Sequence, residues 1–211
     1  MTIALALVVG YLAGSMPFGY WLVRATKGVD IRTVGSGNIG ASNVWRTYGR
    51  RYGLPVVLLD IGKAFVPALV FTQVHSHLAG ALAGAAAMLG HWRPLFLRFA
   101  KGGKMVATAG GAFLGVAPVV GGIGAGVWIV AFLVTRYASV ASILAAASLP
   151  VAAAALGYGW PVIAFGGAAA VGVLVLHRGN LRRLRAGTES RFQLRRRASA
   201  ARAEPSSSRA P

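Results

Sequence analysis

The sequence contains no cysteine and only four acidic residues, and these shortages exclude several kinds of site. Without cysteine a chain has no disulfide, no thiolate nucleophile and no thiolate-bound metal. Four scattered histidines with so few carboxylates do not provide the cluster of ligands that a metal site needs. We therefore expect no metal and no other cofactor.

The residue patterns of several common enzyme classes are also missing. The sequence has no Gly-x-Ser-x-Gly elbow, no histidine five residues before an aspartate, and no pair of carboxylates flanking a possible site. Serine hydrolases, His-x₄-Asp acyltransferases and glycosidases each depend on one of these patterns. Their mechanisms are therefore excluded.

The charge is strongly one-sided, because 22 lysines and arginines face the four acids and give a net charge of +18. In a soluble protein this balance would indicate nucleic acid. Here 56% of the residues are hydrophobic and the mean hydropathy is +0.63, which is typical of an integral membrane protein. The basic residues lie between apolar segments and no nucleic-acid-binding motif accompanies them, so we expect membrane lipid and not nucleic acid as a partner.

The apolar segments predict an all-α integral membrane protein with about seven transmembrane helices, some of them short or broken. We expect these helices at residues 2–23, 53–74, 77–89, 105–117, 119–135, 138–156 and 160–176. Pro17 should kink the first helix, either as a packing feature or as a wall of a site, and Pro118 should break the apolar segment around it. Gly10 and Gly14 have the spacing that lets helices approach closely.

The basic residues predict the orientation of these helices. Every lysine and arginine except Lys63 follows the first, third, fifth or seventh helix, whereas the opposite links carry none. By the positive-inside rule the N-terminus is then outside and the C-terminus cytoplasmic. The first apolar segment lacks the positive start of a signal peptide, so it predicts a retained span. Residues 1–189 should form a single transmembrane domain, and residues 190–211, rich in Arg, Ala, Ser and Pro, a basic disordered tail.

A glycine-rich polar segment, residues 35–46, has the sequence Gly-Ser-Gly-Asn-Ile-Gly-Ala-Ser-Asn-Val-Trp-Arg. Its glycines, amides, two serine hydroxyls and guanidinium suit a phosphate or another oxyanion. The candidate ligand-binding residues are Gly35, Ser36, Gly37, Asn38, Gly40, Asn43 and Arg46. The formal match to the dinucleotide pattern G-x-G-x-x-G is rejected because no strand precedes it, whereas residues 42–49 predict a short helix.

Two later polar segments have related chemistry. The second segment, 101–108, reads Lys-Gly-Gly-Lys-Met-Val-Ala-Thr and offers Lys101, Gly102, Gly103, Lys104 and Thr108. It lacks the spacer and the hydroxyl residue of a Walker loop, and a plain positive-inside loop is its alternative interpretation. The third segment, 177–189, offers His177, Asn180, Arg183 and Glu189. We expect the three polar segments to meet on the cytoplasmic side and form one anion-binding site.

Asp60 and Lys63 are the charged residues that we expect within the membrane. Three positions apart, they lie on one face of a helix and can neutralise each other. They form either a structural ion pair or a support for the site.

The three segments supply cations, amides and hydroxyls but few general bases. Such groups can orient reactants and stabilise developing negative charge. They suit a substrate that arrives already activated, with a good leaving group such as phosphate.

The three polar segments resemble the three cytoplasmic motifs of the bacterial acyl-phosphate:glycerol-3-phosphate acyltransferase family, the PlsY type. The segment around Ser15 and Pro17 and the Asp60-x-x-Lys63 pair resemble the family pattern as well, so the resemblance extends from Tyr11 to Glu189. It implies transfer of an acyl group from acyl phosphate to the 1-hydroxyl of glycerol 3-phosphate, with lysophosphatidic acid and phosphate as products. It implies no obligate protein partner.

The resemblance also implies roles for individual residues. Catalytic roles fall to Ser36, Arg46, His177 and Asn180; substrate binding to Gly35, Gly37, Asn38, Gly40, Asn43, Lys101, Gly102, Gly103, Lys104 and Thr108; and structural support to Asp60, Lys63, Arg183 and Glu189. The sequence departs from the family pattern at Ser42, Ala100 and Met105, where the family usually has threonine, an aromatic residue and glycine. Met105 adds bulk beside Lys104, so we expect at most a changed substrate affinity.

Two alternatives remain open at this point. A channel or transporter for organic phosphates would also combine about seven spans with cationic loops, but it would place polar groups along a path through the membrane. A structural membrane protein would use the same loops only as anchors. Within the acyltransferase interpretation, either a substrate phosphate or His177 takes the proton of the attacking hydroxyl.

Overall fold

The computed structural model describes residues 2–192, and every regular element within them is a helix. The α-helices are α1 (Thr2–Gly14), α2 (Phe18–Lys27), α3 (Ala41–Tyr48), α4 (Arg50–Val74), α5 (His77–Trp92), α6 (Val106–Val116), α7 (Pro118–Thr135), α8 (Ala138–Ala155), α9 (Trp160–Leu176) and α10 (Arg178–Arg185). Two short 3₁₀ turns, η1 (Ile31–Thr33) and η2 (Leu95–Leu97), lie between them. The tail expected at 190–211 lies outside the described residues from 193 onward.

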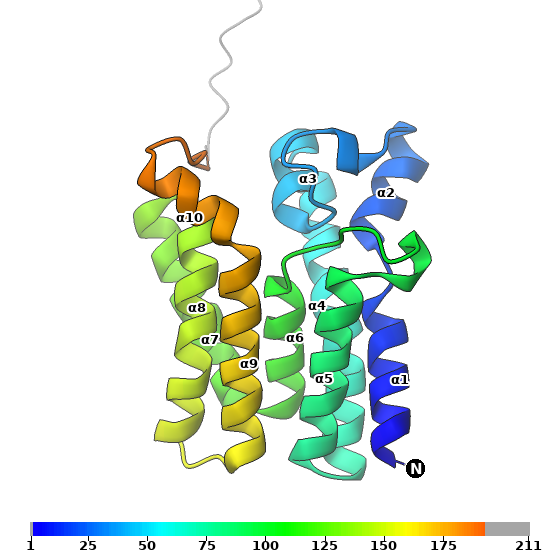
Figure 1. Ribbon diagram of the computed structural model, residues 1–211, viewed down its shortest axis with the longest axis vertical. Coiled ribbons are helices and arrows are strands. Elements are labelled where there is room, and N and C mark those ends of the chain that lie inside the picture. Colours follow the sequence, from blue (N-terminus) through cyan, green and yellow to red (C-terminus); the bar gives the residue numbers. More distant parts are fainter. Residues whose placement is uncertain (1, 193–211) are drawn as a thin grey trace, which may run out of the picture.

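The long helices stand side by side in one bundle (Figure 1). On one side α4 packs against α6 and α5, and α1 packs against α5; on the other side α8 packs against α7 and α9. The short helices α2, α3 and α10 and the loop between α5 and α6 gather at the end of the bundle opposite the N-terminus. We call this the polar end, and it holds all three polar segments.

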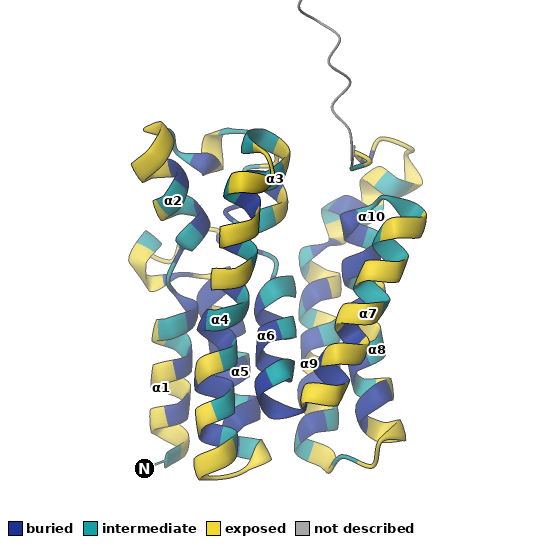
Figure 2. Cartoon of the chain, turned by 180° about the vertical axis from the view of Figure 1, so that it is seen from behind, coloured by how far each residue is buried: buried dark blue, intermediate teal, exposed yellow. Residues whose placement is uncertain are grey.

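The outer faces of the long helices are apolar. Figure 2 shows exposed positions along their outer surfaces and buried ones between them, and exposed side chains include Val134 at 78%, Trp160 at 69% and Val151 at 68%. Contiguous exposed apolar surface of this kind suits lipid and not water. The prediction of an all-α protein with apolar helices is therefore confirmed.

Four helical segments are individually long and apolar enough to cross a membrane: residues 2–27, α4, α7 and α8. The helices α9 and α10 pass as a fifth only if they are taken together across a bend of 55°. The apolar helix α6 has 11 residues, fewer than the roughly 20 that one crossing needs. The count of about seven spans and the orientation of the termini stay predictions.

Most of the expected helix boundaries agree with the structure. The first helix is broken at Ser15–Pro17, the long apolar segment is broken at Ala117, and a short helix follows the glycine turn. Two expectations were wrong. The third polar segment, for which no helix was expected, is mostly the helix α10. The helix expected to end at residue 89 continues as α5 to Trp92, and His91 is buried at 3% exposure.

Small residues bring α1 and α5 into close contact, as their spacing predicts. A methyl group added at Gly10 would meet the carbonyl of Ala83, and one added at Gly14 would meet the carbonyl of Ala87. The two helix backbones can approach so closely only because neither glycine carries a side chain.

Replacing Gly14 with alanine should lower the melting temperature of the detergent-solubilised protein. The added methyl would overlap the backbone of α5, and such overpacking typically destabilises a protein by about 1–3 kcal/mol. Gly126→Ala is the matched control, because Gly126 lies in a helix and has no atom within 4 Å of the added methyl. Equal melting temperatures for the two variants would contradict the packing described here.

Candidate active site

Three contacts close the polar segments into a ring. The Asn38 Nδ2 donates to the Gly102 carbonyl at 3.4 Å and joins the first segment to the second. The Lys104 Nζ donates to the Asn180 Oδ1 at 2.6 Å and joins the second segment to the third. The Arg46 guanidinium donates to the Ser190 carbonyl at 3.2 Å and joins the first segment to the residues that follow the third.

Asn43 holds the first segment in shape. It is buried at 3% exposure, its Oδ1 accepts from the Ser36 backbone N–H at 2.9 Å, and its Nδ2 donates to the carbonyls of Val34 at 3.0 Å and Asn38 at 2.9 Å. Gly35, with φ of 60°, lies where an added side chain would overlap Asn43. Asn43 therefore shapes the loop from inside.

Several of the backbone amides that the sequence offered to a ligand already have partners. The Gly37 N–H donates to the Val34 carbonyl at 3.1 Å, and the Gly40 N–H donates to the Asn38 Oδ1 at 2.7 Å. The Ser36 N–H donates to the Asn43 Oδ1, as described above. The Ser36 and Arg46 residues remain exposed. Side chains, more than these three amides, are thus the groups that the first segment can offer to an anion.

The glycines of the second segment are buried and fasten it to the end of α5. The Gly102 N–H donates to the Trp92 carbonyl at 2.8 Å, and the Gly103 N–H donates to the His91 carbonyl at 2.9 Å. An added side chain at Gly103 would overlap the His91 ring. These glycines are required for close packing, and their N–H groups are not free for a ligand.

The rest of the second segment leads into α6. Thr108 is fully buried, and its hydroxyl donates to the Met105 carbonyl at 3.0 Å, so it stabilises the start of the helix. Met105 has φ of 66°, a left-handed conformation that favours glycine and costs other residues about 1–2 kcal/mol. Glycine, the residue that the resemblance implies at this position, would be less strained there than Met105.

Lys104 is the half-buried cation of the site. Burial lowers its pKa to about 8, and the positive charge of Arg183 acts in the same direction. The other charged groups that act on it are Glu189, which raises the pKa, and Lys101 and Arg46, which lower it. Lys104 is therefore protonated at neutral pH but loses its proton more easily than an exposed lysine.

The third segment is organised around the Glu189 carboxylate. It accepts from the Asn180 Nδ2 at 2.6 Å, the Ser139 hydroxyl at 2.8 Å and the Arg183 Nε at 2.7 Å. Burial alone would raise the pKa of Glu189, but these three hydrogen bonds outweigh it and hold that pKa below its usual value. Because the carboxylate occupies the Asn180 Nδ2, the Asn180 Oδ1 is the atom that faces Lys104.

His177 lies between α9 and α10 and is buried at 4% exposure. Its Nδ1 is 2.8 Å from the Val173 carbonyl, so Nδ1 carries the proton and Nε2 is left as an acceptor. Burial lowers the pKa of His177 to about 4, although the Val173 hydrogen bond opposes this, and the nearby Lys104 lowers it further. The ring is therefore neutral at physiological pH.

Asp60 and Lys63 form the expected ion pair on α4, with 2.7 Å between Oδ1 and Nζ and side chains only 3% and 2% exposed. The pair has a third member that the sequence interpretation missed, because the His91 Nδ1 lies 2.9 Å from the Lys63 Nζ. One signal could have identified it: His91 continues the buried face of α5 that runs through Gly84 and Ala87.

Residues just beyond the third segment also reach the site. The Arg46 guanidinium lies 5.4 Å from the centre of the Phe192 ring, and that ring packs against Trp45 and Phe132 at 6.0 and 5.3 Å. The Phe192 N–H donates to the Arg136 carbonyl at 2.8 Å. Ser190 and Phe192 thus connect α3 to α7, although the sequence interpretation assigned them to the tail.

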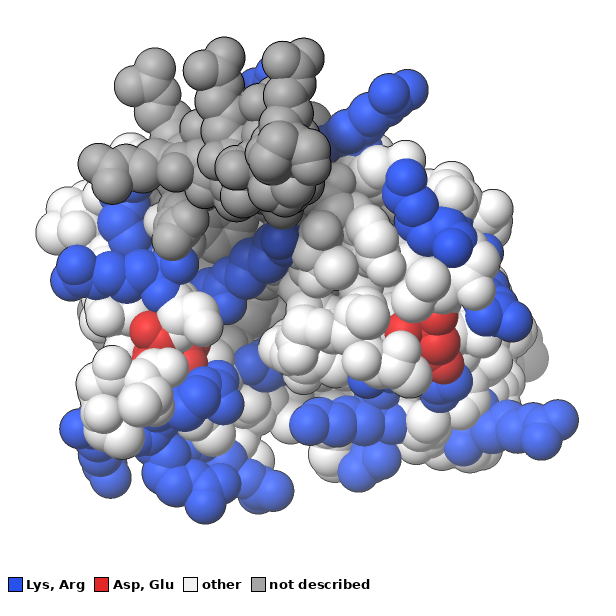
Figure 3. All heavy atoms as spheres, turned by 90° about the horizontal axis from the view of Figure 1, so that it is seen from above, with Lys and Arg blue, Asp and Glu red and all other residues white. Residues whose placement is uncertain are grey.

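Cations surround this end of the molecule. Figure 3, which looks down on it, shows lysine and arginine side chains around its edge and few acids. Within residues 2–192 no group of three histidine, aspartate or glutamate side chains could hold a metal ion. The arrangement can bind and orient phosphate groups and stabilise negative charge.

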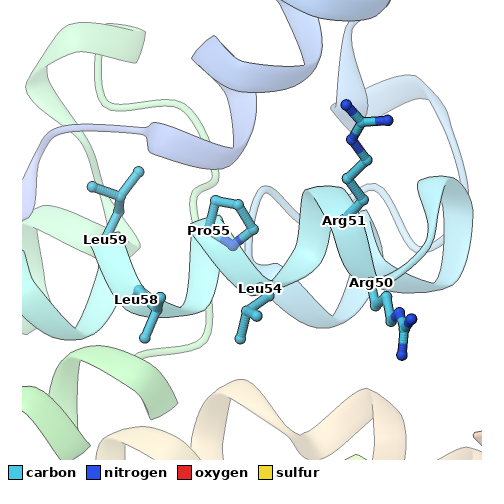
Figure 4. Close-up of a pocket in the computed structure, with 6 residues that line it drawn as sticks. All are labelled: Arg50, Arg51, Leu54, Pro55, Leu58 and Leu59. Carbon is cyan, nitrogen blue, oxygen red and sulfur yellow. The ribbon is translucent and has the colours of Figure 1, made fainter.

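Two shallow hollows on the outer surface lie apart from the three polar segments. The first, on α4, is lined by Arg50, Arg51, Leu54, Pro55, Leu58 and Leu59, with the two arginines at one end (Figure 4). The second runs between α1 and α4 and includes Met16, Phe18 and Lys63. None of the residues from the three polar segments lines either hollow.

Comparison with known proteins agrees with this arrangement. The family model described as glycerol-3-phosphate acyltransferase matches residues 4–187. A glycerol-3-phosphate acyltransferase of Desulforudis audaxviator is 46% identical over 195 residues, covering 92% of this chain and 98% of the relative. One of Geobacter sulfurreducens is 49% identical over 188 residues, covering 88% of this chain and 95% of the relative.

The fold matches a crystal structure as well. PlsY (YgiH), an integral membrane glycerol 3-phosphate acyltransferase, superimposes in its glycerol 3-phosphate form with a TM-score of 0.87 at 39% identity. The match covers 92% of this chain and 96% of PlsY. The lysophosphatidic acid form of PlsY superimposes with a TM-score of 0.85. This chain therefore belongs to the glycerol-3-phosphate acyltransferase family of integral membrane proteins.

Proposed function

We propose that this chain transfers a fatty acyl group from acyl phosphate to the 1-hydroxyl of glycerol 3-phosphate at the polar end of the bundle. The products are lysophosphatidic acid and inorganic phosphate. The observation that carries the proposal is the ring of contacts through Asn38, Lys104 and Arg46, which brings the cations of the three segments together. The chain's membership of an acyltransferase family supports the same reaction. The reaction as proposed needs no cofactor and no protein partner.

The two phosphates have different binding groups in this proposal. Lys104 and Arg46 bind the glycerol 3-phosphate dianion, and the exposed Ser36 hydroxyl binds the acyl phosphate. Asn180 orients Lys104 through their hydrogen bond, and Glu189 orients Asn180. The hydroxyl oxygen attacks the acyl carbon, the bond from that carbon to the phosphate oxygen breaks, and phosphate leaves.

A substrate phosphate takes the proton of the attacking hydroxyl. The competing acceptor is the His177 Nε2, but with a pKa of about 4 this nitrogen is a weak base at neutral pH. A phosphate monoester, whose second pKa is about 6, is the stronger base in the same place.

The site lies on the cytoplasmic side in this proposal. The chain crosses the cell membrane about seven times, with the N-terminus outside, because the basic residues gather at the polar end, where the positive-inside rule places the cytoplasm. The transporter alternative is not favoured. Its polar groups would follow a path through the membrane, whereas those of the three polar segments gather at one end.

Purified protein in detergent should release phosphate from palmitoyl phosphate only when glycerol 3-phosphate is added. Ser36→Ala should lower kcat/KM by about 10²-fold, the usual effect of losing one donor to a developing anion. Ser148→Ala is the matched control, because that hydroxyl only donates within α8. Phosphate release that does not depend on glycerol 3-phosphate would contradict the proposed reaction.

The value of kcat/KM for glycerol 3-phosphate should fall as the pH rises through about 8. Above its pKa of about 8 Lys104 is neutral and no longer attracts the phosphate dianion. Lys104→Arg should remove this fall, since a guanidinium stays charged throughout the range. A fall at the same pH in Lys104→Arg would show that another group is responsible.

The value of kcat should fall as the pH drops through about 6, where a substrate phosphate becomes protonated and can no longer accept the proton. The midpoint should be the same in His177→Asn, whatever the absolute rate of that variant, because the amide nitrogen can keep the Val173 hydrogen bond. A midpoint that disappears in His177→Asn would identify His177 as the base.

A further inference from the structure

We propose that Asp60, Lys63 and His91, here called the polar trio, are positioning residues that hold the turn at residues 101–104 and through it the Lys104 ammonium. The trio lies against Gly103 of the second polar segment through the His91 ring and touches no substrate in the proposed scheme. The kinetic part of this inference rests on the proposed role of Lys104 in binding glycerol 3-phosphate. Its structural part stands on contacts alone.

Lys63 is fully engaged by partners from three parts of the chain. Its Nζ lies 2.7 Å from the Asp60 Oδ1 on α4, 2.9 Å from the His91 Nδ1 on α5, and 2.8 Å from the Met16 carbonyl. An ammonium has three N–H donors, so each finds one acceptor. The Met16 carbonyl is available because it lies in the break between α1 and α2, where helical hydrogen bonding is interrupted.

These contacts also determine the state of the histidine. Since Lys63 donates to Nδ1, that nitrogen carries no proton, and the ring proton of a neutral His91 is on Nε2. The ring is thus anchored at one nitrogen and presents its other edge to the second polar segment. An added side chain at Gly103 would overlap Nε2, which places this edge directly against the Gly103 backbone.

The turn is fastened to the same residue through its backbone. The Gly103 N–H donates to the His91 carbonyl at 2.9 Å, and the Gly102 N–H donates to the neighbouring Trp92 carbonyl at 2.8 Å. Lys104 comes next in the chain, and its Nζ reaches the Asn180 Oδ1. The position of the ammonium therefore depends on where His91 holds the turn.

Burial of the trio argues that its geometry matters. Taking charges out of water is unfavourable, and well-packed apolar residues often serve stability equally well. Counted over the whole residue, Asp60, Lys63 and His91 are 2%, 7% and 3% exposed. Their polar contacts join α4, α5 and the break after α1. An apolar substitute would fill the same space without orienting the imidazole.

The kinetic test compares His91→Ala with Phe71→Ala. Removing the imidazole should raise KM for glycerol 3-phosphate about tenfold or more and change kcat less, because the phosphate-binding lysine moves and small displacements at such sites have large effects. Phe71 is buried near the C-terminal end of α4, away from the polar end of the bundle, so Phe71→Ala controls for general destabilisation. His91→Asn, whose Oδ1 can still accept from Lys63, should recover part of the loss and serves if His91→Ala does not fold.

The second test needs no activity. Because the chain has no cysteine, a spin label attached to Lys101→Cys reports on the turn alone. Adding His91→Ala should increase the mobility of the label, whereas adding Phe71→Ala should not.

The outcomes separate this inference from the proposed function. A more mobile label with an unchanged KM would support the positioning of the turn and contradict the role of Lys104 in binding glycerol 3-phosphate. An unchanged label in both His91 variants would overturn the inference. Equal changes in His91→Ala and Phe71→Ala at equal losses of melting temperature would overturn it as well.

Discussion

The hydrogen bond between the Lys104 Nζ and the Asn180 Oδ1 is the contact on which the site depends. It joins the loop between α5 and α6 to α10, two elements that belong to different sides of the bundle. A flexible lysine side chain does not keep this geometry by itself, so both partners need further contacts. The Glu189 carboxylate accepts from the Asn180 Nδ2 and so orients the amide. The hydrogen bonds of the Gly102 and Gly103 N–H groups to the end of α5 fix the backbone next to Lys104.

The three acids among residues 2–192 each form a salt bridge with a lysine or arginine a few residues away. Asp30 pairs with Arg32 at 2.6 Å and accepts from its backbone N–H at the start of η1, just before the first segment. Asp60 pairs with Lys63, whose partner His91 contacts Gly103 of the second segment. Glu189 pairs with Arg183 at 2.7 Å within the third segment. Of these acids, Glu189 organises the third segment directly, and Asp60 is joined to the second through Lys63 and His91.

Much of the fold could be predicted from the sequence because lipid imposes simple constraints. Apolar segments had to be helices, Pro17 and Pro118 had to interrupt or begin them, and the basic residues had to lie between them. The helix α10 was missed, since its arginine-rich sequence has no apolar span to reveal it. Met105 was recognised as a departure from the family pattern, but its left-handed conformation could be found only in the structure.

The site residues were identified from their chemistry, but their partners were not. The sequence suggested that Gly102 and Gly103 offer free amides, whereas both N–H groups bond to the end of α5. His91 was missed although its spacing continues the buried face of α5, because that spacing does not reveal the contact with Lys63 on another helix. Residue type predicts which groups a site contains, and only packing decides which of them are already occupied.

The most direct test of the account is the side of the membrane from which the three segments can be reached. Single cysteines at the exposed positions Ser36, Lys101 and Thr188, with Ser76 in the link between α4 and α5 as the opposite reference, can be labelled in oriented vesicles with a membrane-impermeant thiol reagent. The account predicts that the first three react from one side and Ser76 from the other. Reaction of any one of the three from the side of Ser76 would contradict a single site built from all three segments.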